Sequence, residues 1–315
     1  MKNVCRKIFL LFLIILLCAT VASAKLLVPG GQVIGLQLAD ESVTVVDFAP
    51  HLGDGAVAAG LQKGDKILQV DKEKITCVKD LRNALSRSDG KVKLKISRSG
   101  KEKTLSLHPK ITADGPKLGV FLKEGLTGLG TVTFYDPQTG NFGALGHGVN
   151  DPNGKLLTMK AGQVYEAAVA AVKKGAVGAP GQLLGHLHEK QLGDLAKNTN
   201  QGVFGKLDGK GDALPTGQAK VGAATIRATV EKEDLQEYSV EILKIYPNTA
   251  GRTRNMLLKV TDDRLLSCTG GIVQGMSGSP IIQDGKLVGA VTHVLVNDPT
   301  TGYGIFIENM LDAAA

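Results

Sequence analysis

The feature that most constrains this chain is a glycine-rich turn at 269–280 that carries two serines. The run reads Thr-Gly-Gly-Ile-Val-Gln-Gly-Met-Ser-Gly-Ser-Pro, with Ser277 between Gly275 and Gly278. Glycine on both sides admits backbone conformations that other residues rarely adopt, so the chain can turn sharply around the serine. Such a turn exposes the hydroxyl and can direct the amide hydrogens of Gly275 and Ser277 to one point beside it, as in an oxyanion hole. A plain turn between two strands would use the same residues.

A β-hairpin is predicted directly after this turn. Residues 281–291 read as strand, Asp284-Gly285 turn and strand, and Asp-Gly between apolar runs is a strong hairpin signal. Glycine accounts for 40 of the 315 residues and tryptophan is absent. This composition favours many short strands joined by tight turns, so we expect a mainly β protein.

Ser277 would need a base within hydrogen-bond reach to act as a nucleophile. Of the six histidines, His147 is bracketed by Gly146 and Gly148, which allow close approach of another backbone. His293 follows the nucleophile hairpin, where it would line a substrate pocket or pack in the core. We therefore expect His147 to be the base. Ser279 is the rival nucleophile, but it lies beyond the glycine that would permit the sharp turn.

The serine turn with its hairpin resembles the second barrel of trypsin-like serine peptidases, including the bacterial HtrA type. The chain is more specifically similar to the stage IV sporulation protein B peptidase family. The runs that carry this similarity are 146–149 (Gly-His-Gly-Val), 269–280, 290–293 and 296–304. The number of short strands in the chain fits two small antiparallel barrels. The resemblance implies a strand that forms a substrate pocket from Ala290, Val291, Thr292 and His293.

The same resemblance implies the third member of a catalytic triad. The family carries an acid at the position of Asp262, giving the chain order His147, Asp262, Ser277. The acid of trypsin-like folds usually lies farther from the serine than the fifteen residues found here, so this spacing departs from that pattern. Asp263 is the local rival, and a solvated turn carboxylate is the structural alternative for either.

A PDZ domain is expected before the peptidase. The run from Gly55 to Asp71 combines a short helix, a Lys-Gly-Asp turn and a strand, and closely resembles PDZ domains. Residues 79–85 have apolar positions at helical spacing. A PDZ domain binds an extended segment by adding it to a sheet edge, and the fold resemblance places that site at Ile34, Gly35 and Leu36. Another part of the same chain could fill this groove.

The first residues have the pattern of an export signal. Lys2, Arg6 and Lys7 precede an apolar run that begins at Ile8, and Ala22-Ser23-Ala24 offers a small-x-small cleavage site. The run of about 14 apolar or small residues is shorter than the roughly 20 of a spanning helix, although an uncut membrane anchor is the alternative. The predicted division is 1–24 signal or anchor, 25–112 PDZ domain and 113–315 serine peptidase domain.

Charge and cysteine content narrow the partners. The formal net charge of +7 falls to +4 without the three cations of the signal, and no aromatic residues alternate with the lysines, so nucleic acid is excluded as a partner. Two of the four cysteines lie in the predicted signal, and Cys77 and Cys268 lie outside it. We expect these two to be buried thiols rather than a disulfide. His186 and His188 lack a third ligand at a usual spacing, so neither a metal nor another cofactor is expected.

The family resemblance implies an exported serine endopeptidase with a PDZ targeting domain. Such an enzyme acts in the intermembrane space around the forespore, cleaves itself, and cleaves a membrane-bound regulator to trigger signalling between compartments during endospore formation. An HtrA-like envelope quality-control protease is one alternative, but it usually carries its PDZ domain after the peptidase. A catalytically inactive PDZ peptide-binding protein is the other.

Overall fold

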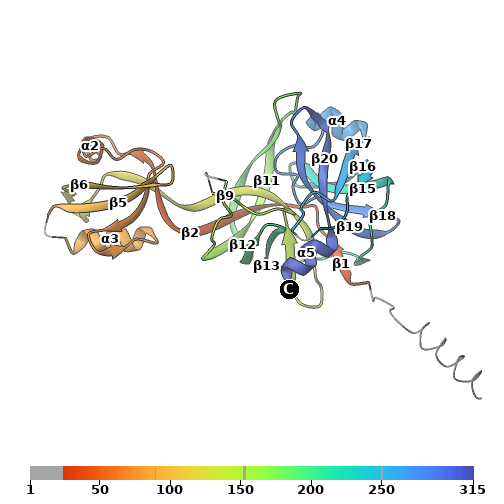
Figure 1. Ribbon diagram of the computed structural model, residues 1–315, viewed down its shortest axis with the longest axis horizontal. Coiled ribbons are helices and arrows are strands. Elements are labelled where there is room, and N and C mark those ends of the chain that lie inside the picture. Colours follow the sequence, from red (N-terminus) through yellow and green to blue (C-terminus); the bar gives the residue numbers. More distant parts are fainter. Residues whose placement is uncertain (1–23, 89, 152–153, 250) are drawn as a thin grey trace, which may run out of the picture.

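The computed structural model describes residues 24–88, 90–151, 154–249 and 251–315. It shows two bodies joined by two long strands, β2 (Val33–Phe48) and β9 (Val120–Tyr135) (Figure 1). The predicted signal segment lies outside the described residues except for Ala24. Within those residues, no helix has both the length and the apolar character needed to span a membrane.

The larger body contains two antiparallel barrels. In the first, the strand order β2, β9, β10, β13, β12, β11 closes because β11 pairs with β2. Its core includes Leu36, Leu38 and Phe142. The other strands of this barrel are β10 (Asn141–Ala144), β11 (Ala161–Lys173), β12 (Gln182–Thr199) and β13 (Gly202–Lys206), and β1 (Leu26–Pro29) joins β9 to β14 (Leu214–Pro215).

The second barrel is closed by six strands around a core that includes Ile226, Ile242 and Leu258. Two helices flank it, α4 (Asp263–Thr269) before the serine turn and α5 (Ile307–Ala314) at the end of the chain. The predicted double-barrel architecture is therefore confirmed. The six strands are β15 (Gly222–Glu231), β16 (Asp234–Ile245), β17 (Met256–Val260), β18 (Pro280–Gln283), β19 (Lys286–Leu295) and β20 (Asp298–Phe306).

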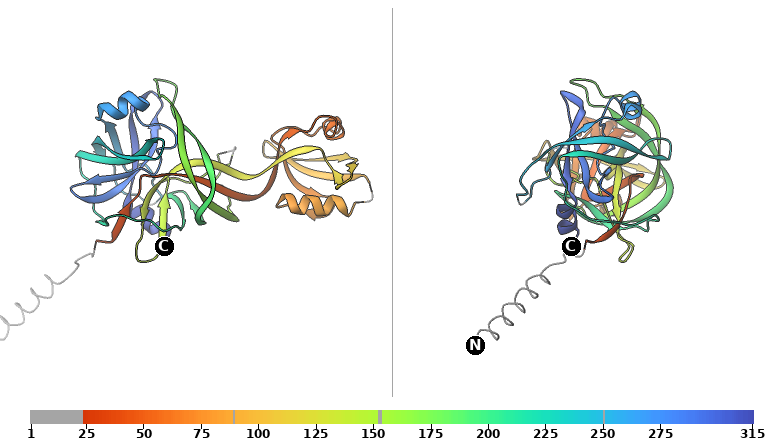
Figure 2. Two further views of the ribbon diagram at one scale, coloured as in Figure 1. Left: turned by 180° about the vertical axis from the view of Figure 1, so that it is seen from behind. Right: turned by 90° about the vertical axis from the view of Figure 1, so that its right-hand side faces the viewer.

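The smaller body is the predicted PDZ domain, which stands apart from the two adjacent barrels (Figure 2, left). The distal halves of β2 and β9 pair with each other there, and Val43, Ile67 and Leu94 lie in its core. Its remaining elements are α2 (Asp54–Ala58), β3 (Lys66–Val70), β4 (Glu73–Lys74), α3 (Val78–Ser86), β5 (Val92–Arg98), β6 (Lys101–Leu107), β7 (Lys110–Thr112) and β8 (Gly115–Lys117).

The PDZ domain interrupts the first barrel instead of simply preceding it. β1 and the first half of β2 lie within the predicted range 25–112, yet they pair with β9, β11 and β14. The chain enters the PDZ domain along β2 and returns along β9. The division at 112/113 therefore follows the order along the chain, whereas in space the peptidase includes the strands on both sides of the PDZ domain.

Two segments of the first barrel are strands. The Val/Ala-rich run at 163–174 predicts a strand from its β-branched content, and β11 covers 161–173. The sequence before Gly193 also allows a short helix, but 182–199 form β12, whose two edges pair with β11 and β13. Pairing on both sides determines this conformation more strongly than local propensity does. Cys77 and Cys268 are free thiols and are only half-buried.

Candidate active site

The serine turn lies between α4 and β18 and depends on glycine at defined positions. Gly275 and Gly278 both have a φ of 101°, a conformation that residues with a Cβ atom rarely adopt. A Cβ atom on Gly278 would also lie 2.0 Å from the Thr131 carbonyl oxygen. The turn therefore packs directly against β9 of the first barrel, and no larger residue fits at Gly278.

Two threonines of β9 hold this turn. The Thr131 amide donates to the Ser277 carbonyl at 3.1 Å, and the Thr131 hydroxyl donates to the Gly275 carbonyl at 2.7 Å. The buried Thr133 hydroxyl donates to the Gly278 carbonyl at 2.8 Å. The first barrel thus fixes the position of a nucleophile that belongs to the second.

Amide hydrogens within the turn divide into two groups. Met276 and Ser279 donate to backbone carbonyls inside the turn, and Gly278 donates to the Val291 carbonyl. Among the described residues, the amides of Gly275 and Ser277 donate to no backbone carbonyl. These two amides are the predicted oxyanion donors, and they remain available to a ligand.

His147 follows β10, at a bend in the first barrel. Leu145 and Gly146 precede it with φ values of 70° and 67°, and a Cβ atom on Gly146 would lie 2.9 Å from the Thr292 side chain. The His147 Nδ1 atom lies 2.9 Å from the Gly148 carbonyl oxygen. Because a carbonyl only accepts, Nδ1 carries the proton of the neutral ring and Nε2 is left as an acceptor.

Asn198 of β12 holds the loop after His147. Its Oδ1 atom accepts from the Val149 amide at 2.9 Å, and its Nδ2 atom donates to the Val149 and Leu157 carbonyls, both at 2.9 Å. Sequence reasoning missed this residue, since nothing local to Asn198 indicates a partner 49 positions away. The amide side chain thus fixes the backbone that directly follows His147 and Gly148.

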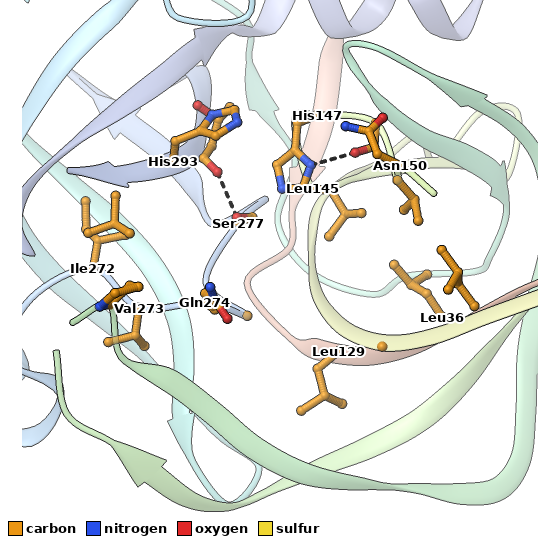
Figure 3. Close-up of a pocket in the computed structure, with 18 of the residues that line it drawn as sticks. Leu36, Leu129, Leu145, His147, Asn150, Ile272, Val273, Gln274, Ser277 and His293 are labelled. Atoms are coloured by element: carbon orange, nitrogen blue, oxygen red, sulfur yellow. Dashed lines mark hydrogen bonds between the residues drawn. The ribbon is translucent and has the colours of Figure 1, made fainter. Parts of the chain in front are cut away.

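Ser277, His147 and His293 line one cleft of about 660 Å³ (Figure 3). Leu36, Leu129 and Leu145 contribute to an apolar wall from the first barrel, and Ile272 and Val273 to one from the second. The Ser277 Oγ atom donates to the Thr292 carbonyl at 2.8 Å rather than to a histidine. The structure therefore brings the predicted nucleophile and base into the same cleft but leaves the hydroxyl bonded elsewhere.

His293 is a second imidazole in this cleft. Its ring centroid lies 5.2 Å from that of His147, and its buried Nδ1 atom has no hydrogen-bond partner within the described part of the chain. Burial, with smaller effects of His147 and Arg254, lowers the pKa of His293 to about 4. Burial also lowers the pKa of His147, against the opposing effect of its hydrogen bond to Gly148. Both rings are therefore neutral at pH 7.

The predicted substrate-pocket strand is placed only in part. Thr292 and His293 line the cleft. Ala290 and Val291 do not, because both are fully buried in the hydrophobic cores. The register of β19 against β20 shifts between Val291 and His293, so the residues before the shift pack in the cores and the residues at and after it face the cleft. This part of the prediction is corrected.

Asp262 does not reach the cleft. It is the N-cap of α4, where its carboxylate accepts from the Arg264 amide at 2.9 Å and from the Ser239 amide at 3.2 Å. The Arg264 guanidinium lies 2.8 Å from the same carboxylate. These hydrogen bonds lower the pKa of Asp262 to about 2, with the side-chain bond from Arg264 contributing most. Asp262 stabilises a helix start here, and its rival Asp263 is exposed in the first turn of α4.

The rival serine is not available as a nucleophile. Ser279 is fully buried, and its hydroxyl donates to the Met276 carbonyl at 2.7 Å. Its hydroxyl closes the serine turn from within. Ser277 is half-buried and faces the cleft.

Ile34, Gly35 and Leu36 do not form the peptide groove of the PDZ domain. They lie in the first-barrel half of β2, where both edges are paired, with β9 on one side and β11 on the other. Ile34 and Leu36 are buried in the barrel core. No strand can be added to an edge that is already occupied, so this prediction is wrong.

A second cleft of about 530 Å³ identifies the groove of the PDZ domain. It lies between α3 and residues 116–122, with Leu81 and Leu85 on the helix side and Leu118 and Val120 on the other. In the described chain, the start of β9 pairs with β2 on one edge only. The run Leu-Gly-Val-Phe at 118–121 is the sequence signal for this site, namely a glycine between apolar residues ahead of a strand.

His186 and His188 are neighbouring histidines of β12. The rings of His186 and His188 lie 4.9 Å apart. Among the described residues, no group of three or more His, Cys, Asp or Glu side chains gathers as a ligand set.

Family models match both the peptidase part and the PDZ domain of this chain. A family model described as SpoIVB peptidase S55 matches residues 115–311, and a PDZ domain model matches 32–108. A putative zinc metalloprotease of Staphylococcus aureus (strain N315) is 48% identical over 58 residues, which are 18% of this chain and 14% of that protein. One of Brucella suis biovar 1 (strain 1330) is 30% identical over 145 residues, 46% of this chain and 36% of that protein.

The chain thus spans well under half the length of these curated relatives. Among solved structures, the active form of the Rv3671c protease from M. tuberculosis aligns with 14% identity and a TM-score of 0.37. That alignment covers 60% of this chain and 73% of the other. The SpoIVB peptidase S55 model covers more than half of this chain.

Proposed function

The chain belongs to the SpoIVB peptidase S55 family, and from this premise we propose that it is a serine endopeptidase in which His147 activates Ser277. The observation that carries the proposal is the convergence of four groups on one cleft. These are the Ser277 hydroxyl, the neutral His147 ring and the unpaired amides of Gly275 and Ser277. Two barrels supply them, so neither barrel contains the site alone.

The reaction begins when the Ser277 hydroxyl turns from the Thr292 carbonyl toward the Nε2 atom of His147. His147 accepts the proton as Oγ attacks the substrate carbonyl carbon, and the two amides donate to the developing oxyanion. His147 then gives the proton to the leaving amine, and water hydrolyses the acyl-enzyme by the same steps. The Gly148 carbonyl holds Nδ1–H throughout, so a backbone group orients the base.

We propose for this protein the biological role that the family resemblance implies. The protein would be exported, act in the intermembrane space of the forespore, cleave its own chain and cleave a membrane-bound sporulation regulator. The PDZ groove between α3 and the start of β9 would bind segments of those chains. Measuring when the protein is produced tests this role: production confined to sporulation would support it, and production under heat stress would favour an HtrA-like quality-control enzyme.

Self-cleavage tests the enzymatic proposal. The chain from Lys25 onward contains every described element, and it is compared with its Ser277→Ala and Ser279→Ala variants. We expect fragments, and labelling by a serine-directed phosphonate, in the first and third proteins and neither in the second. Cut sites are read by mass spectrometry. A folded chain that shows neither fragments nor label contradicts the proposal and favours a PDZ peptide-binding protein.

A further inference from the structure

Three cations beside the cleft rest on two neighbouring tyrosines. Lys244 Nζ lies 5.1 Å from the ring centroid of Tyr246, and the Arg252 guanidinium carbon lies 5.4 Å from the same centroid. The Arg254 guanidinium carbon lies 5.2 Å from the centroid of Tyr303, and the two rings are 6.5 Å apart. We call these five residues the cationic rim.

The cationic rim is connected directly to the catalytic cleft. Tyr303 of β20 pairs with His293 of β19, and the Thr292 hydroxyl donates to the Tyr303 carbonyl at 3.1 Å. Arg254 is close enough to His293 to contribute to its lowered pKa. A chain that passes His293 toward solvent in this direction therefore meets Tyr303 and then the three cations.

No carboxylate of the described residues forms an ion pair with the rim cations Lys244, Arg252 and Arg254. The sequence from Ile242 to Thr261 contains four Lys or Arg residues and no Asp or Glu. Among the described residues, the Arg252 side chain donates to the Pro247 carbonyl at 3.4 Å and to no carboxylate. Contact with the rings restricts the long side chains while leaving their charges available.

We propose that the cationic rim binds an acidic segment of the substrate chain that flanks the scissile bond. Carboxylates would pair with the guanidinium and ammonium groups, while the ring faces would support the intervening side chains. The proposal rests on the proposed peptidase function and adds the substrate class. A peptide fits better than a membrane surface because Tyr303 of the rim pairs with His293, which lines the cleft that contains the nucleophile.

Two matched peptides test this specificity. Both contain the same self-cleavage site, and one is flanked by three glutamates where the other has three glutamines. Each exposed ion pair is individually weak, so we expect about a 10-fold higher kcat/KM for the acidic peptide at low salt. Raising the salt to about 0.5 M shortens the Debye length and should reduce this ratio toward one.

The variant Arg252→Gln/Arg254→Gln removes two charges and should reduce the ratio to below about three. Lys101→Gln/Lys103→Gln makes the same charge change on exposed lysines of the PDZ strand β6 and should leave the ratio unchanged. The proposal is overturned if Arg252→Gln/Arg254→Gln leaves the kcat/KM ratio of the two peptides unchanged, whether kcat/KM falls equally for both peptides or for neither. Loss of binding to anionic phospholipid vesicles by the first variant with the peptide ratio intact also overturns it, since the rim would then be a membrane contact.

A binding measurement separates this proposal from the proposed function. Fluorescence anisotropy of the two labelled peptides with Ser277→Ala does not depend on turnover. Tighter binding of the acidic peptide that disappears in Ser277→Ala/Arg252→Gln/Arg254→Gln supports the rim even if no cleavage is found. Equal affinity for both peptides refutes the rim even where phosphonate labelling identifies Ser277 as the nucleophile.

Discussion

Replacing Asp262 by asparagine should affect stability and leave catalysis nearly intact. The carboxylate caps α4 and pairs with Arg264, and it does not line the cleft that holds Ser277 and His147. Asparagine is about as good an N-cap as aspartate, so Asp262→Asn keeps the hydrogen bond from the Arg264 amide. What it removes is the charge that the guanidinium stabilises.

The magnitude follows from the pKa of Asp262. A fall from the ordinary 3.8 to about 2 corresponds to about 2.4 kcal/mol at 1.36 kcal/mol per pKa unit. Because the Arg264 side chain is 63% exposed, solvent screening reduces the expected loss to about 1–2 kcal/mol. A lowered pKa stabilises the folded state above pH 3.8, and this contribution disappears as the pH falls through about 2. The melting temperature should fall by about 2–8 °C at pH 7.

Thermal unfolding and steady-state cleavage at 25 °C measure the two effects separately. Asp263→Asn is the matched control, because it makes the same charge change at an exposed position one residue away. We expect both variants to keep kcat within about threefold of the parent. Replacing the acid of a serine-peptidase triad by its amide generally lowers kcat about 10⁴-fold. A folded Asp262→Asn protein with a loss of that size would refute the placement of Asp262 outside the catalytic group.

Three further predictions concern the serine turn and its base. Thr133→Val leaves the buried Gly278 carbonyl without its donor, so urea titrations should show a free energy of unfolding lower by about 1–3 kcal/mol. Thr133→Ser keeps a hydroxyl at this position and should retain most of the parent's free energy of unfolding. Gly278→Ala places a Cβ atom 2.0 Å from the Thr131 carbonyl oxygen, so phosphonate labelling of Ser277 should be lost, and normal labelling would contradict the geometry of the turn. Because burial lowers the pKa of His147, the base stays neutral below its ordinary pKa of 6.5. The pH profile of kcat/KM should therefore retain more than half of its maximum at pH 6.5.

The serine turn and His147 could be predicted from sequence because their signals are local. Glycines beside Ser277 and His147 mark positions where the backbone adopts positive φ or approaches another strand, and such residues are visible without a fold. The two barrels followed from the number of short strands and turns. By contrast, the assignment of Asp262 depends on the family resemblance alone, although a pair of aspartates before an apolar run also marks a helix start.

The sequence offers two candidates for the PDZ groove, 34–36 and 118–121, and the choice between them depends on how distant strands pair, as does the role of Asn198. Ile34 to Leu36 have the composition of a groove-forming strand. Only the pairing with β11 shows that the edge a peptide would need is already occupied. Asn198 contacts a loop 49 residues earlier. Each of these contacts exists only after the first barrel closes, and a single sequence contains no direct record of that closure.

Strand β9 gives a physical reason for the position of the PDZ domain inside the first barrel. Its first residues form one side of the PDZ groove, Leu126 and Leu129 line the catalytic cleft, and Thr131 and Thr133 hold the serine turn. A PDZ domain attached after the second barrel would not contain part of the strand that holds the serine turn. Here a bound segment and the scissile bond would contact the same continuous strand, so the distance between groove and cleft is set by β9 rather than by a linker.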